Sequence, residues 1–273
     1  MLFKFSKAFS RAVKYVSSAE RNDVGTISYQ HFQSKGMVIS AVINEIVDGQ
    51  LGSLANGGRP DVKVNRRKAF EFGEEGNVDH EGKYSIFGQI CNQLRESSPD
   101  MSHFRHSSVD EKCYSIKYLG EGSIDAGGPF RESLVNIVDE MEAGLVPLMI
   151  KSPNNRNDHG TNRDCYILNP TSTSPAHLEM YKYLGGYIAY GILSKSPIPL
   201  NLAPTVWKAI LGERMSLSDL ESIDAYSSQI LTDLQSHGAS LSDADFAAGV
   251  DQNFTSVLSN GDEVELCDNG QDR

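Results

Sequence analysis

The chain has 273 residues, 39% of them hydrophobic and 22% charged, which is the composition of an ordinary globular protein. No apolar run approaches the roughly 18 residues that a membrane-spanning helix needs. The formal net charge of −11 is concentrated in residues 213–273, which contain thirteen acidic residues and two arginines, and this distribution argues against a nucleic-acid-binding protein.

The first 18 residues contain no acid and have the pattern of a basic amphipathic helix. Its apolar positions, three or four residues apart, are Leu2, Phe5, Phe9, Ala12 and Val16. Its basic residues are Lys4, Lys7, Arg11 and Lys14. We favour a helix docked on the rest of the protein over a membrane-surface helix or an organelle-targeting peptide, although all three share this pattern.

The next stretch suggests a boundary between two units. Residues 37–47 are densely apolar and predict a buried helix, and alternation at 61–65 predicts a short strand. Residues 71–82 are rich in glycine and acidic residues and predict an exposed loop. We therefore expect an N-terminal helical extension and linker over residues 1–82 and a second unit over residues 83–273.

The second unit is expected to begin with a helix capped by Ser85, with Cys91 on its buried face. Alternation at 114–119 predicts a half-buried strand. A glycine-rich turn follows at 120–128. Pro129 then fits the first position of another helix, where its missing N–H costs nothing.

The longest predicted helix starts at Ser174–Pro175, after a polar loop at 154–162 and a strand at 165–168. Its buried stripe is expected to be Leu178, Tyr181, Leu184, Ile188 and Ile192. Three glycines, at positions 185, 186 and 191, lie inside it. Because interior glycine costs up to ~1 kcal/mol relative to alanine, they indicate that another element packs close to this helix.

Three signals describe the C-terminal part. Pro204 opens a predicted helix, and Ser218–Glu221 has the spacing of a capping box at the start of a further one. Asn260–Gly261 separates two short alternating segments, 254–258 and 263–266. This arrangement predicts a β-hairpin.

The glycine-rich turn lies between a predicted strand and a predicted helix, where backbone amides can bind phosphate. The match to a dinucleotide fingerprint fails because Asp125 takes the place of the third glycine, and no Gly-Lys-Ser/Thr follows for a P-loop. We therefore favour a structural turn. A nucleotide-using enzyme is a distant alternative.

Neither the histidines nor the cysteines form a recognisable reactive site. His103 and His106 could hold one ion, but they lack neighbouring ligands, so we expect surface residues. The four cysteines are far apart and form no C-x-x-C pair: Cys91, Cys113, Cys165 and Cys267. We expect reduced thiols, no metal and no cofactor.

The strongest pattern is an ordered series of segments. Asp125–Glu132 reads Asp-Ala-Gly-Gly-Pro-Phe-Arg-Glu and follows a strand that ends Tyr-Leu-Gly-Glu-Gly. Six more segments keep a fixed order: 85–89, 166–170, 183–192, 206–213, 219–224 and 264–270. Together they resemble the N-lobe of the HECT-type E3 ubiquitin ligases, and the variants around Trp207–Lys208 resemble the HERC-like branch. The resemblance covers about residues 36–273.

The resemblance implies an α+β fold that is mainly α-helical, a HECT N-lobe with small β-hairpins and no C-lobe. Family members take ubiquitin from an E2 ubiquitin-conjugating enzyme onto a ligase cysteine and pass it to a substrate lysine. Their E2-binding subdomain and cysteine-bearing C-lobe follow the Asn-Gly turn at residues 269–270. The resemblance therefore implies E2 and ubiquitin as partners of the full-length protein, an unknown substrate protein, and an isolated chain without activity.

No catalytic residue carries over onto this chain from the family. Six residues are instead expected to form a structural motif: Asp125, Gly127, Gly128, Pro129, Arg131 and Glu132. The two glycines are expected to set the start of the helix. The charges of Arg131 and Glu132 are expected to find partners across the lobe.

The main alternative is a non-catalytic protein-interaction scaffold derived from such a lobe, which would bind partners through its acidic end. We expect no nucleic-acid partner, and membrane contact by residues 1–18 is the less favoured interpretation of that segment. The location expected for either function is the cytoplasm, with the nucleus as the alternative.

Overall fold

A computed structural model describes most of the chain from residue 58 onward. The described residues are 24–25, 58–106, 112–121, 127–238, 242, 245, 253–258 and 260–272. The helices expected at 1–18 and 37–47 lie outside them, as does Asp125. None of the helices in the described part is long and apolar enough to cross a membrane.

The described elements are mainly helices, together with three two-stranded sheets. The first group is β1 (Asp61–Val64), α4 (Arg66–Glu74), α5 (Ile86–Ser97), η4 (Ser102–Phe104), β2 (Ser115–Tyr118) and α6 (Gly128–Glu142). The middle group is β3 (Met149–Lys151), α7 (Pro153–Asn157), β4 (Tyr166–Leu168) and α8 (Pro175–Ser194). The last group is α9 (Pro204–Leu211), α10 (Leu217–Glu221), α11 (Ala225–Gly238), β5 (Thr255–Val257), β6 (Glu263–Glu265) and η5 (Gly270–Asp272). The expected mainly α-helical α+β class is confirmed.

One of the small sheets is a parallel pair, whereas hairpins were expected. Strands β1 and β2 place Val62 opposite Ile116 and Val64 opposite Tyr118, and these side chains are buried. The pair contacts α5 and α6. β3–β4 and β5–β6 are antiparallel, and β5–β6 confirms the predicted hairpin.

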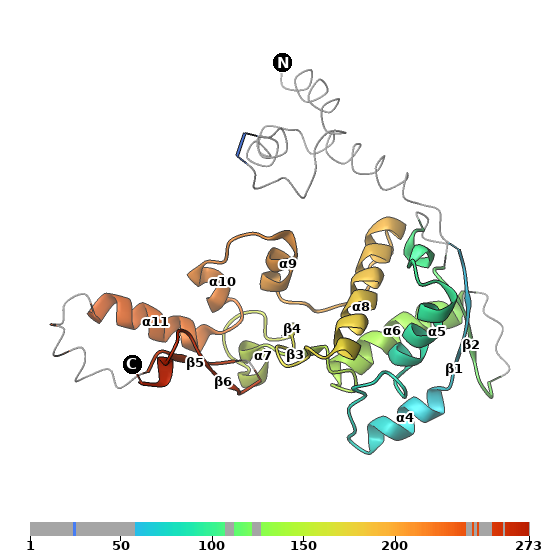
Figure 1. Cartoon of the computed structure of the whole chain (residues 1–273), viewed down its shortest axis with the longest axis horizontal. Helices are drawn as coiled ribbons and strands as arrows, with labels where there is room; N and C mark the ends of the chain where they lie inside the picture. The colour runs from blue at the N-terminus through green and yellow to red at the C-terminus, as the bar shows by residue number, and fades with distance from the viewer. Residues whose placement is uncertain are drawn as a thin grey trace.

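The core lies where β1, β2, α5 and α6 meet α8, and α11 and the β5–β6 hairpin lie on the other side of the described part (Figure 1). Aromatic rings fill its centre. Phe104 meets Tyr187 edge to face at 5.0 Å between ring centroids, and Phe130 meets Tyr114 in the same way at 5.0 Å. Such edge-to-face pairs add to the stabilisation that burial gives.

The buried face of α8 differs from the predicted stripe. Leu178 and Ile192 at its ends are 58% and 57% exposed, so their predicted burial was wrong. Leu184 of the predicted stripe is buried, and Tyr181 and Ile188 are partly buried and pack against the core. The stripe did not include four further core residues of the helix, which are Met180, Tyr183, Tyr187 and Tyr190. The predicted stripe therefore overlaps the buried face in part and missed three buried tyrosine rings.

Only part of the expectation about the glycines of α8 is confirmed. A Cβ on Gly186 would lie 2.4 Å from the Phe104 ring, and one on Gly191 would lie 3.2 Å from the Ser196 carbonyl oxygen. η4 and the chain after α8 therefore do approach the helix backbone. Gly185 faces open space, with nothing within 4 Å of the point that a Cβ would occupy.

The exposed loop expected at 71–82 was wrong in part. Helix α4 continues to Glu74, and Asp79 is only 2% exposed because its carboxylate binds backbone amides. The β1–β2 pairing also joins residues on both sides of the expected boundary at 82. The division into two units stays a prediction.

Two local corrections concern polar segments. The loop expected at 154–162 contains helix α7, capped by Ser152, whose side chain accepts a hydrogen bond from the Asn155 amide. The capping box of α10 begins at Ser216, two residues before the predicted Ser218, with Asp219 as its third helical residue. The caps predicted for α5 and α8, Ser85 and Ser174, are confirmed.

Candidate functional site

The expected structural motif lies where the glycine-rich turn enters α6. Gly127 has φ +112°, a conformation that favours glycine, and it is the N-cap residue of the helix. Gly128 is the first helical residue and Pro129 the second. The Arg131 amide donates to the Gly127 carbonyl at 3.3 Å, which closes the first turn. The two glycines thus form the bend at which α6 starts.

Arg66, the first residue of α4, connects this bend to the end of β2 and to α6. Its guanidinium binds both Glu121, after β2, and Glu132, on α6. It also lies 4.0 Å from the centre of the Tyr118 ring. The hydrogen bond from Arg66 lowers the pKa of the Glu121 carboxyl. Arg131, in contrast, is exposed and forms no ion pair within the described part of the chain.

Replacing Arg66 by alanine is expected to lower the free energy of unfolding by about 1 kcal/mol, because two ion pairs and a cation–π contact are lost at a partly accessible site. Urea unfolding followed by circular dichroism measures the change. Arg131→Ala is the matched control and should change stability by less than about 0.5 kcal/mol. Equal losses for the two variants would contradict this assignment.

A row of buried hydroxyl groups continues inward from α6. The Tyr187 hydroxyl donates to that of Tyr114 at 3.3 Å, and Tyr114 lies 2.8 Å from the Ser133 hydroxyl. Ser133 in turn donates to the Phe130 carbonyl at 2.6 Å. Burial raises the pKa of both tyrosines well above the usual value, so neither can act as a base at neutral pH. The row joins α8 and α6 through Tyr114, the residue before β2.

Two buried carboxylates hold the start of α5. Asp79 accepts hydrogen bonds from the amides of Lys83, Tyr84 and Ser85 at 2.8–2.9 Å, and from the Ser85 hydroxyl at 2.6 Å. Glu140 of α6 accepts from the next two amides, at 2.7 and 3.0 Å. Negative charge at a helix N-terminus is favourable because the free amides point toward it.

Among the described residues, Glu140 is the acid whose pKa is raised to near neutral pH. Burial raises its pKa from 4.5 to about 7, although the amides of α5 oppose the shift. Its position on the buried face of α6, three residues after Ile137, is the sequence signal that could have revealed it. Sequence reasoning had missed Arg66, Asp79 and Glu140.

The protonation of the Glu140 carboxyl should make the free energy of unfolding depend on pH. Because its pKa is higher in the folded state, the protonated carboxyl contributes fully to stability below pH 4.5. This contribution is lost as the pH rises to about 7 and the folded state gives up the proton. The difference in unfolding free energy between wild type and Glu140→Gln should therefore fall by on the order of 2 kcal/mol over this range. Urea titrations from pH 4.5 to 8 measure it, and a difference that rises with pH would contradict the assignment.

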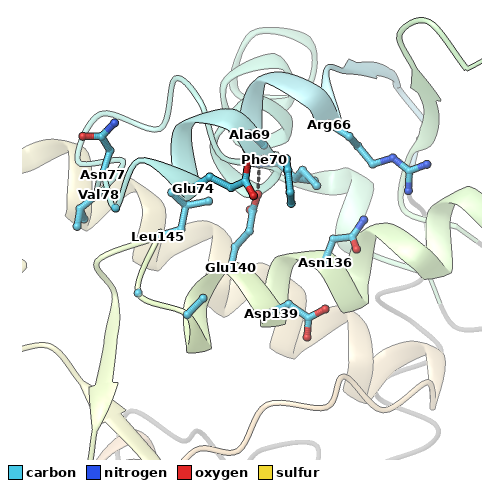
Figure 2. Close-up of a pocket in the computed structure, with 15 residues that line it drawn as sticks. Arg66, Ala69, Phe70, Glu74, Asn77, Val78, Asn136, Asp139, Glu140 and Leu145 are labelled. Atoms are coloured by element: carbon cyan, nitrogen blue, oxygen red, sulfur yellow. Dashed lines mark hydrogen bonds between the residues drawn. The ribbon is translucent and has the colours of Figure 1, made fainter.

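A hollow of about 590 Å³ lies next to Glu140, between α4 and α6. Figure 2 shows side chains of α4 along one side and side chains of α6 along the other. Apolar side chains line much of it: Ala69, Phe70, Val78, Ile86, Ala143 and Leu145. Phe70 is 64% exposed and Val78 40% exposed, so an apolar surface faces solvent here.

No thiol or imidazole of the described residues is arranged as a nucleophile and base. Burial raises the pKa of the Cys91 and Cys113 thiols well above the usual value, and burial and Asp164 raise that of Cys165. Such thiols are protonated at neutral pH and react slowly. The expected burial of Cys91 on α5 is confirmed.

The surface position expected for His103 and His106 was wrong, since both are buried. The His103 ring packs 4.2 Å from that of Phe104, because η4 is pressed against α8 at Gly186. Burial lowers the pKa of His103 to about 4, and its ring nitrogens have no hydrogen-bond partner among the described residues. The described residues also contain no group of three or more potential ligands that could hold a metal ion.

Residues 135–273 match the family model described as HECT-domain (ubiquitin-transferase). The chain belongs to the HECT-domain family. The match begins within α6 and includes every later element. The HECT assignment thus covers α8, whose tyrosines fill the core, and Glu140, which holds α5.

The relatives of this HECT chain are ubiquitin ligases. It is 37% identical to the E3 ubiquitin-protein ligase HERC2 of Mus musculus and 36% identical to that of Homo sapiens, in each case over 177 residues, or 65% of the chain. It is 22% identical over 88% of its length to the probable E3 ubiquitin-protein ligase HECTD4 of Homo sapiens. The chain spans 3% of the length of either HERC2 protein and 6% of HECTD4.

Proposed function

We propose that the chain is the N-lobe of a HECT-type E3 ubiquitin ligase of the HERC-like branch and lacks the cysteine that receives ubiquitin. The match of residues 135–273 to the HECT-domain family carries the proposal. The similarity to HERC2 supports the branch. The expected partners in the full-length ligase are a ubiquitin-charged E2 and the substrate protein, in the cytoplasm or nucleus.

The reaction consists of two acyl transfers. In the first, a ligase thiolate attacks the carbonyl carbon of the E2–ubiquitin thioester; a new thioester forms and the E2 thiolate leaves. In the second, the amine of a substrate lysine attacks this thioester; an isopeptide bond forms, the lysine nitrogen loses a proton, and the ligase thiolate is released. The first acceptor must be a thiolate, because only a thioester keeps the ubiquitin carbonyl reactive toward the amine.

The described residues suit a supporting role in this chemistry. Two of the four cysteines, Cys91 and Cys113, are buried in the core, where the C-terminus of ubiquitin has no access to their thiols. Arg66 binds Glu121 and Glu132, Asp79 binds residues 83–85, and Glu140 binds the first amides of α5, so each of these charged groups joins parts of the fold. The lobe would therefore hold the parts of the ligase that perform the transfer.

Incubating the chain with E1, E2, ubiquitin and ATP tests the proposal. We expect no ubiquitin adduct that dithiothreitol removes, and discharge of the E2 at the rate seen without the chain. Cys165→Ser and Cys267→Ser, which change the two partly accessible thiols, are the controls. A reducible adduct that one of these substitutions abolishes would overturn the proposal that the acceptor thiol lies outside the chain.

A further inference from the structure

The hollow between α4 and α6 has an apolar surface that no described element covers. Phe70 and Val78 at its edge are exposed to 64% and 40%. Large apolar side chains gathered around one hollow are typical of a binding surface, whereas single exposed ones need no explanation. The volume of about 590 Å³ has room for two or three large side chains of an amphipathic helix.

The charge around this hollow is negative. Glu74 on α4 and Asp139 on α6 line it, are exposed, and form no ion pair within the part of the chain that the structure describes. The only cation among its lining residues, Arg66, is already bound to Glu121 and Glu132. An occupant with apolar side chains and flanking basic groups therefore fits this surface, because opposite charges select partner and orientation.

Residues 1–18 of the same chain have these properties. Phe5, Phe9 and the other apolar residues recur at helical spacing, four basic residues accompany them, and no acid is present. Thirty-nine residues, 19–57, separate this segment from Gly58, where the continuously described part of the chain begins. This connection keeps the segment on the same molecule as the hollow, which raises its effective concentration there above that of a free peptide.

We propose that the hollow between α4 and α6 binds residues 1–18 of its own chain as an amphipathic helix. Phe5 and Phe9 contact Phe70 and Val78, and the basic side chains lie toward Glu74 and Asp139. The proposal assigns a role to the acid-free segment and to the apolar surface beside Glu74 and Asp139. It does not depend on the ubiquitin-transfer function.

Photo-crosslinking in the full-length chain tests the contact. A benzophenone amino acid placed at Phe70 should crosslink to a peptide within residues 1–18, as read by mass spectrometry. The same group at Val257, which is 67% exposed on β5, is the control and should not. An equal mixture of isotopically light and heavy chains distinguishes attachment within one chain from attachment to a second copy.

Charge exchange tests the specificity. Glu74→Lys together with Asp139→Lys should reduce the crosslink at least fivefold, and Lys4→Glu with Lys7→Glu should restore at least half of it. Circular dichroism of each variant verifies that the lobe remains folded. Crosslinks from Phe70 to another segment, crosslinks only between light and heavy chains, or a yield that charge reversal does not change would each overturn the proposal. A chain that binds anionic vesicles, and whose crosslink is lost with Phe5→Asp but not with charge reversal, would instead show that residues 1–18 bind a membrane.

Discussion

Replacing Asp79 by alanine should lower the free energy of unfolding by about 4 kcal/mol, the largest effect expected of a polar substitution in this lobe. The carboxylate accepts four hydrogen bonds from residues 83–85 and is 2% exposed. Without it, three amides near the start of α5 lose their partner in a place that water reaches poorly. Each buried donor left without an acceptor costs roughly 1–3 kcal/mol.

Urea unfolding of matched variants separates this loss from a general effect of removing charge. Asp79→Asn keeps one acceptor oxygen and should cost about half as much. Glu75→Ala removes an exposed carboxylate from the same loop and should change stability by less than about 0.5 kcal/mol. If the Asp79→Ala and Glu75→Ala variants had the same free energy of unfolding, the hydrogen bonds from Asp79 to residues 83–85 would not stabilise the fold.

The second large effect is expected from Gly88→Ala on α5, with a loss of about 3 kcal/mol. A Cβ at this position would lie 2.4 Å from the backbone atoms of Gly82. Backbone cannot move aside as a flexible side chain can, and Gly82 has φ +67°, so the whole turn after Asp79 would have to shift. This cost exceeds the gain of up to ~1 kcal/mol that alanine normally brings to a helix.

Gly185→Ala on α8 is the control for this substitution. It is also a helical glycine, but nothing lies within 4 Å of its added Cβ. It should therefore raise the free energy of unfolding by up to about 1 kcal/mol. Thermal and urea unfolding of both variants measure the opposite signs. A stabilising Gly88→Ala would show that the close contact between α5 and the turn at Gly82 does not exist in solution.

Local sequence signals predicted elements that carry their own caps or alternation. Ser85 and Ser174 marked the starts of α5 and α8 because their hydroxyls accept the first free amides, and alternation marked β1 and β2. Strand β3 was not predicted, since its apolar residues do not alternate with polar ones and it forms by pairing with β4. Helix α7 contains asparagines of low helix propensity, and Asn154 instead bonds to distant carbonyls at Thr161 and Glu221.

The candidate site was less predictable than the fold. The glycine bend could be read from the sequence because positive φ and a helix-opening proline are local properties. Arg66 and Glu140 act on partners more than fifty residues away, and no local pattern contains that information. The exposure of Phe70 likewise follows from what packs around α4, so the hollow between α4 and α6 appeared only in the structure.

The central claim is that these residues form a supporting lobe and that the reactive thiol lies outside them. The most direct measurement isolates the native polypeptide with an antibody against residues 127–238, charges it with E1, E2, ubiquitin and ATP, and maps the ubiquitin thioester by mass spectrometry without reductant. The account predicts a polypeptide well above the 30.0 kDa of this chain, with a thioester on a cysteine C-terminal to Arg273. A thioester on Cys91, Cys113, Cys165 or Cys267, or a native polypeptide of 30.0 kDa that accepts no ubiquitin, would contradict it.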